Sequence, residues 1–220
     1  MTMSDLAQRV TTSNGKLVYK LGNETLVVEP RGRDGLRVRA TVEPEILDTE
    51  WALTEAAESQ ATIAVSEQAA VIRSGKISAH LQDIFTQMAH LQFFGHTGDR
   101  VILVLGEQDY VVHAHSSGTR IFKPSADGLA HSEVHFSTRN VERLYGMGLN
   151  ATGWVDLKGT VIDLYERHVK YVVPFLVSSE GYGFLRNNPS LGRVELANNL
   201  TRWVSYGCRQ VDYYITAGES

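Results

Sequence analysis

The sequence predicts a single all-β domain, an antiparallel β-sandwich with few or no long helices. Turn residues interrupt the chain at intervals of roughly 8–12 residues, which is the spacing typical of a sandwich. The run from Leu36 to Ala40 alternates apolar residues with two arginines, the period of a strand with one buried face. Helical periodicity with end caps is nearly absent. Because no linker or internal repeat divides residues 1–220, we expect one domain.

The predicted strands follow one another along most of the chain. Gly22-Asn23 and Ser74-Gly75 are turn dipeptides that end two of them. The remaining strand boundaries come from alternating or continuous apolar runs between polar segments. The predicted ranges are 16–20, 26–29, 36–40, 61–65, 69–73, 101–105, 110–114, 134–136, 161–165, 172–177 and 210–216.

Two segments are ambiguous. Between Leu81 and Leu91 the apolar residues fall at helical spacing, which predicts an amphipathic helix over 78–94 when this segment is taken alone. Two strands, 77–84 and 88–94, with a turn at 85–87 fit the neighbouring β pattern better, and we predict the strands. Residues 47–58 contain good helix formers and are expected to form a short helix or a loop.

Composition excludes several classes of function. A hydrophobic content of 43% and a charged content of 21% are ordinary for a globular protein. The net charge of −4, without a long basic cluster, argues against a nucleic-acid partner. The longest clean apolar run, 101–105, is too short to span a membrane. Cys208 is the only cysteine and residues 1–10 lack the apolar core of a secretory signal, so we expect a cytoplasmic protein.

The last third of the chain carries a series of glycine and aromatic motifs. An opening pair, Val28-Glu-Pro30 and Leu36-Arg-Val-Arg39, precedes them. The later motifs are Leu144-Tyr-Gly-Met-Gly148, Asp156-Leu-Lys-Gly159, Val173-Pro-Phe175, Gly181-Tyr-Gly183 and Asn187-Asn-Pro189. In order and spacing this series resembles the N-terminal domain of glycoside hydrolase family 31, which contains α-glucosidases and α-xylosidases. The resemblance runs from about residue 25 to the end.

Local chemistry is consistent with a scaffold role for these motifs. Gly146 and Gly148 allow a turn or bulge with positive φ where a strand leaves the sheet. Gly181 and Gly183 flank Tyr182, so that a hairpin can close with the ring packed across it. Pro174 predicts an edge strand or the first residues of a strand, because proline cannot donate to a sheet ladder.

The resemblance implies an antiparallel supersandwich of the galactose-mutarotase type that packs against a catalytic (β/α)₈ barrel. Such a barrel needs about 250 residues, and this chain has no segment left to form one. The family's catalytic aspartates lie on the barrel, so no catalytic residue is expected here, and no metal or other cofactor. The implied function is the N-terminal domain of an α-glycosidase that hydrolyses terminal α-linked sugars with retention. Its expected partners are its own barrel and an oligosaccharide or α-glycoside, and a bare barrel-facing surface would favour a homo-oligomer.

The resemblance also implies a substrate-binding loop. In the family, a loop of this domain helps to shape the outer sugar subsite at the barrel mouth. Its counterpart is the polar insert between Asp163 and Pro174, with the substrate-binding candidates Tyr165, Glu166, Arg167 and His168 at its centre. A carboxylate, a guanidinium and an aromatic ring suit sugar hydroxyls and the apolar face of a sugar. The alternative is a solvated loop held by local ion pairs.

Histidines offer a competing hypothesis of a metal site. His113 and His115 lie two residues apart, so on a strand both imidazoles face the same side and can share a metal, as in cupins. His131, Glu133 or His135 could supply a third ligand. A cupin motif requires a glutamate soon after, and residues 116–120 contain none, so we predict no bound metal.

A stand-alone carbohydrate-binding or sugar-epimerising sandwich is the runner-up. A mutarotase uses a histidine and a carboxylate as acid and base on the same kind of sandwich, but its motifs match less well here than those of family 31. Trp51, Trp154 and Trp203 are candidate sugar-stacking platforms. We expect at least two of them to lie in the core instead, because large aromatics dominate sandwich cores.

Overall fold

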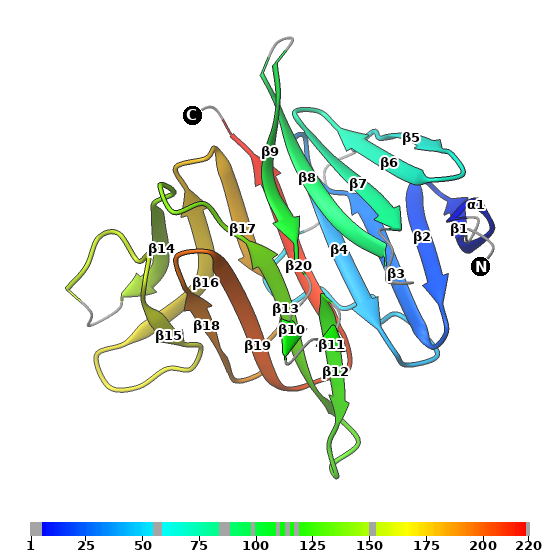
Figure 1. Ribbon diagram of the computed structural model, residues 1–220. Coiled ribbons are helices and arrows are strands. Elements are labelled where there is room, and N and C mark those ends of the chain that lie inside the picture. The colour runs from blue at the N-terminus through cyan, green and yellow to red at the C-terminus, as the bar shows by residue number, and fades with distance from the viewer. Residues whose placement is uncertain are drawn as a thin grey trace.

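The computed structural model shows two large antiparallel sheets stacked face to face (Figure 1). It describes residues 6–54, 59–83, 89–97, 100–108, 111–112, 115–116, 119–149 and 153–218. The one helix in this part of the chain is α1 (Leu6–Arg9), a single turn before the first strand. No helix within these residues is long and apolar enough to cross a membrane. The predicted all-β sandwich is confirmed.

The first sheet, sheet A, has eight strands and includes both the first and the last of the described strands. In order across the sheet they are β1 (Val10–Ser13), β2 (Lys16–Leu21), β3 (Glu24–Pro30), β4 (Gly35–Thr41), β20 (Val211–Ala217), β17 (Tyr182–Arg186), β16 (Tyr171–Ser178) and β14 (Leu144–Leu149).

The second sheet, sheet B, has ten strands, one of which, β12 (Arg120–Pro124), pairs only with β13. The others, in order, are β15 (Val161–Asp163), β18 (Gly192–Leu196), β19 (Leu200–Cys208), β13 (Ala130–Ser137), β9 (Arg100–Glu107), β8 (Ala89–Thr97), β7 (Ile77–Asp83), β6 (Ala69–Ser74) and β5 (Thr62–Val65). A small separate pair joins β10 (Val111–Val112) and β11 (His115–Ser116).

Both ambiguous segments have β or irregular structure. β7 and β8 pair antiparallel, with Asp83 opposite Ala89, so the strand prediction is confirmed over the helix. The predicted turn at 85–87 lies outside the described residues. Residues 47–54 form a loop, and 55–58 also lie outside the description. The predicted strand ranges omit β1, β11, β12, β14, β17, β18 and β19, and β15 ends at Asp163, before the predicted end at Tyr165.

Aromatic rings fill the centre of the core between the sheets. Phe184 stacks on Tyr213 of sheet A with ring centroids 4.9 Å apart and on Trp203 of sheet B at 4.8 Å. Phe136 meets Phe184 edge-on at 5.4 Å. These contacts tie β17 and β20 to β13 and β19, so the two sheets share one continuous core.

β4 is buried on both faces, which corrects the prediction of a half-buried strand. Arg37 is fully buried and binds Asp212 with two nitrogens, Nε to Oδ1 at 3.0 Å and Nη2 to Oδ2 at 2.7 Å. Arg39 donates Nη2 to Glu29 Oε1 at 2.7 Å. The loop after β4 covers these arginines, because its Glu50 accepts a bond from Arg37 at 3.1 Å. The alternation therefore separates an apolar buried face from an ionic buried face.

Pro174 lies in the middle of β16, a strand with a neighbour on each side, which corrects the prediction of an edge or strand-start position. β16 pairs with β14 on one side and β17 on the other. The pairing with β14 breaks between Gly146 and Gly148, and the pairing with β17 begins only at Phe175, so Pro174 needs to donate to neither neighbour. A Cβ on Gly148 would lie 2.3 Å from the Tyr171 carbonyl oxygen, so the predicted glycine bulge is confirmed.

Candidate functional site

The predicted substrate-binding loop connects the two sheets at one end of the sandwich. It leaves β15, the edge strand of sheet B, and enters β16 of sheet A (yellow, lower left in Figure 1). Leu164, the first residue after β15, is buried and donates its backbone N–H to the Gly192 carbonyl at 2.7 Å. The loop therefore begins from a fixed point on the sheet edge.

Tyr165 is the centre of a local hydrogen-bond network. Its hydroxyl donates to Asp163 Oδ2 at 3.0 Å and accepts a bond from Arg167. The Arg167 guanidinium lies over the Tyr165 ring, 4.6 Å from the centroid, and Lys170 Nζ lies 5.6 Å from it. Lys170 Nζ also donates to the Asp163 carbonyl at 2.8 Å. The hydrogen bond to Asp163 raises the pKa of Tyr165, so the phenol stays neutral and donates.

A tight turn over residues 167–170 closes the loop. Lys170 N–H donates to the Arg167 carbonyl at 3.0 Å, which leaves His168 and Val169 at the two central positions. Val169 has a φ of 62°, in the left-handed region that β-branched residues rarely adopt. Such backbone strain is concentrated at functional sites, where the surrounding contacts hold it in place. Here the Tyr165 network holds both sides of the turn.

The four predicted site residues divide into two pairs. Tyr165 and Arg167 bind each other and form the frame of the loop. Glu166 and His168 are exposed, and neither has a hydrogen bond or ion pair with another residue in the described part of the chain. Hydrogen bonds and cation–π contacts hold the frame, in place of the local ion pairs of the alternative prediction. Glu166 and His168 present a carboxylate and an imidazole to the outside. Both groups can hydrogen-bond sugar hydroxyls.

Among the described residues, the competing histidines form no metal site. No three His, Cys, Asp or Glu side chains within the described ranges lie close enough together to hold a metal. His113 and the side chain of His115 lie outside the description, so the absence of a metal stays a prediction. His131 and His135 each place Nε2 near Glu133, at 3.0 and 3.3 Å.

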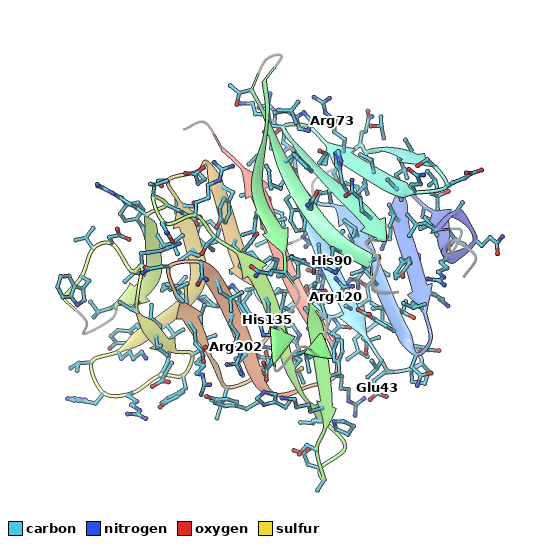
Figure 2. The ribbon with its side chains drawn as sticks, viewed as in Figure 1. Glu43, Arg73, His90, Arg120, His135 and Arg202 are labelled. Atoms are coloured by element: carbon cyan, nitrogen blue, oxygen red, sulfur yellow. The ribbon has the colours of Figure 1, made fainter. Side chains whose placement is uncertain are left out.

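Glu133 forms an ionic cluster on β13. Arg202, opposite His135 on the neighbouring strand (Figure 2), donates Nε to Glu133 at 2.9 Å, and Lys123 lies at 3.3 Å. Burial disfavours the charged carboxylate, but the bonds from Arg202, His131 and Lys123 outweigh it and lower the pKa of Glu133 to about 2. The cluster therefore stabilises the ionised form of Glu133.

The prediction that at least two of the three tryptophans lie in the core is wrong. Trp203 is in the core at 6% exposure, but Trp51 and Trp154 are 56% and 70% exposed. Trp51 borders a cleft of about 370 Å³. Asn187 and Asp212 at the same cleft are bonded to each other at 3.0 Å, so these two polar groups are already used inside the protein.

The sandwich matches a known family of domains. Residues 25–195 match the family model described as the glycosyl hydrolase 31 N-terminal galactose mutarotase-like domain. The chain belongs to glycoside hydrolase family 31. Its predicted resemblance and its mutarotase-like fold are therefore confirmed.

Relatives of this family 31 domain are much longer proteins. An uncharacterised family 31 glucosidase from Pseudescherichia vulneris is 34% identical over 99% of this chain and 42% of its own length. A crystal structure of a family 31 α-xylosidase from a soil metagenome, complexed with xylose, superposes with a TM-score of 0.85 at 32% identity. The superposition covers 96% of this chain and 32% of that enzyme. A xylosidase from Aspergillus niger aligns at 26% identity with a TM-score of 0.78 over 93% of this chain and 30% of that one.

The chain thus spans less than half of these relatives and corresponds to their N-terminal domain. Sequence reasoning proposed four residues of this loop, and the structure adds Lys170 and Val169 to its frame and turn. Lys170 is a lysine within reach of an aromatic ring, a signal that was readable as a cation–π pair. Val169 carried no signal, because a left-handed residue is normally marked by glycine or asparagine.

Proposed function

We propose that this family 31 domain belongs to an enzyme that hydrolyses terminal α-xylosides or α-glucosides with retention of configuration. The domain supports the catalytic barrel and borders its sugar pocket with the loop at 165–170. Relatives named α-xylosidase support the substrate class. Retaining hydrolysis needs two carboxylates about 5–5.5 Å apart, and we assign that pair to the barrel. The chain itself needs no cofactor in this scheme, and its one free thiol, Cys208, is consistent with a reducing cytoplasm.

One observation supports the loop's role most strongly. Glu166 and His168 point outward from a turn whose frame is fixed by Tyr165, Arg167 and Lys170. A binding group on a rigid support loses little conformational entropy when it captures a ligand. The frame therefore makes the exposed pair better suited to bind a sugar than flexible surface residues would be.

The test is Glu166→Ala in the longer polypeptide that contains this domain and its barrel. The measurement is kcat/KM for disaccharides that differ in the leaving sugar and for a small aryl glycoside, which hardly occupies the outer subsite. Loss of one sugar contact costs about 1–3 kcal/mol, so disaccharide turnover should fall roughly 5- to 150-fold. Aryl glycoside turnover should change much less.

Glu43→Ala is the matched control. Glu43 is also an exposed glutamate in a loop, and it lies across the molecule from the 165–170 loop (Figure 2). The Glu43→Ala variant should leave kcat/KM unchanged for both kinds of substrate. Equal losses on both substrates for Glu166→Ala would mean that the loop acts on the barrel in general, and the proposed subsite contact would be wrong.

A further inference from the structure

The cleft beside Trp51 lies between loops of the sandwich. The loop after β4 contributes Trp51 and Leu47, and the β12–β13 hairpin contributes Leu129. The loop between β17 and β18 contributes residues 187–190, and the end of β19 with the following turn contributes residues 207–210. The volume of about 370 Å³ falls within the range of pockets that bind small molecules, about 300–1,000 Å³.

Hydrogen bonds inside the protein fix the walls of this cleft. Gln210 joins the β19–β20 turn to the loop after β4, because its side chain accepts from the Leu47 N–H at 2.8 Å and donates to the Leu47 carbonyl at 3.0 Å. Asn188 donates to the Gln210 carbonyl at 3.1 Å and accepts from the Ser190 N–H at 2.9 Å. The cleft is therefore formed before a ligand arrives, and binding there loses little conformational entropy.

The two charged side chains that line the cleft differ in their pairing. Asp212 is buried, and its carboxylate binds Arg37 at 2.7 Å. Arg209 is exposed, and its guanidinium makes no hydrogen bond or ion pair with another described residue. Glu43 and Glu45 are exposed acids of the loop after β4, but they are not part of the lining. Among the described residues of the lining, the unpaired charge is therefore positive.

Trp51 supplies a flat apolar surface to the same cleft. Its side chain is 56% exposed, and Leu47 beside the cleft is 37% exposed. An indole ring presents a large rigid face on which the apolar face of a sugar ring can stack. A guanidinium binds a carboxylate with two parallel hydrogen bonds. A ring platform and an unpaired guanidinium in one cleft thus suit a sugar that carries a carboxylate.

We propose that this cleft binds a sugar acid, with the sugar ring on Trp51 and the carboxylate on Arg209. The inference goes beyond the proposed function, because the cleft uses none of residues 165–170 and takes no part in hydrolysis. It gives the domain a ligand of its own, an acidic glycan, in addition to the α-glycoside of the proposed enzyme.

The first experiment observes Trp51 directly. The chain has three tryptophans, so a ¹H–¹⁵N NMR spectrum of the 220-residue chain contains three indole signals, and Trp51→Phe assigns one of them. Methyl α-glucuronide should shift the Trp51 signal with a Kd on the order of 1 mM, which is usual for a ligand of this size. Trp154, 70% exposed and outside the cleft, is the internal control and should not shift.

The second experiment separates the carboxylate from the sugar ring. Methyl α-glucoside differs from methyl α-glucuronide only in the group at C6, which is a neutral hydroxymethyl. It should bind at least roughly tenfold more weakly, because it cannot pair with the guanidinium. Acetate, which lacks the ring, should also bind more weakly than methyl α-glucuronide. Added salt should weaken the binding of methyl α-glucuronide, since an exposed charge pair is screened.

Arg209→Gln tests the cation, and Arg33→Gln is the matched control. Arg33 is also exposed and without a hydrogen bond or ion pair of its side chain to another described residue. It precedes β4, whereas Thr41 at the far end of β4 binds the Arg209 carbonyl. Arg209→Gln should weaken the binding of methyl α-glucuronide roughly tenfold or more and leave that of methyl α-glucoside unchanged. Arg33→Gln should change neither.

Three results would overturn the proposal. The absence of a Trp51 shift at methyl α-glucuronide concentrations roughly tenfold above the expected Kd would show that the cleft is not a sugar site. Equal Kd values for the two methyl glycosides would remove the carboxylate from recognition. Equal losses for Arg209→Gln and Arg33→Gln would indicate a general charge effect. All these measurements use the 220-residue chain, so they do not depend on the outcome for Glu166→Ala in the longer polypeptide.

Discussion

Replacement of Asp212 by asparagine should destabilise the domain, because it leaves a buried arginine with less than its full counter-charge. Arg37 is fully buried and Asp212 is 3% exposed, and two short hydrogen bonds join them. Removal of one partner from a buried pair usually costs about 3–5 kcal/mol. Glu50 at 3.1 Å and Glu29 at 3.7 Å remain near Arg37, so we expect a smaller loss, about 2–4 kcal/mol.

The assay is urea unfolding of the 220-residue chain, followed by tryptophan fluorescence, with Glu195→Gln as the control. Glu195 pairs with Arg193 at 2.7 Å, but both side chains are partly solvated, so this variant should lose less than about 1 kcal/mol. Adding Arg37→Met to Asp212→Asn should recover part of the loss, because the unpaired charge is then gone. Equal losses for Asp212→Asn and Glu195→Gln would refute the argument that burial makes the Arg37 pair costly to break.

Three further predictions concern activity, strain and pH. The 220-residue chain should not hydrolyse aryl α-glucosides or α-xylosides, and turnover that depends on one of its own acids would contradict the assignment of catalysis to the barrel. Val169→Gly should raise the free energy of unfolding by about 0.5–1 kcal/mol, since glycine accepts a φ of 62° without strain; a loss of stability in urea would disprove this. The Glu133 carboxylate, with its pKa of about 2, should contribute about 2 kcal/mol to the free energy of unfolding above pH 5 and lose this contribution as the pH falls towards 2. A Glu133→Gln variant whose stability keeps the wild-type pH dependence would argue against it.

Much of the scaffold was predictable because its constraints are local. Gly148 is required where strands β14 and β16 approach each other too closely for a Cβ, and its motif predicted the bulge. The burial of Arg37 was not predicted. Alternation of apolar and charged residues shows that a strand has two different faces, but it does not show whether the charged face meets solvent or a buried ionic layer. That layer depends on Asp212, which is 175 residues away. β18 was missed although Val194 and Leu196 alternate with Arg193 and Glu195, so its strand period was present in the sequence.

The site was only half predictable for a related reason. The loop residues were proposed from motif order, but their division into a frame and an exposed pair depends on side-chain geometry. Tyr165 and Arg167 are two residues apart, and only the structure shows that they bind each other. The exposure of Trp51 and Trp154 was likewise hidden, because burial of a loop tryptophan depends on what packs above it.

The most direct test of the central claim is a crystal structure of the longer polypeptide with an unhydrolysed α-linked disaccharide bound. We predict that Glu166 or His168 lies within about 3.2 Å of a hydroxyl of the outer sugar, with the Tyr165–Arg167 contact unchanged. A complex in which the 165–170 loop faces bulk solvent, away from the bound disaccharide, would contradict the proposed role of this domain in the sugar pocket.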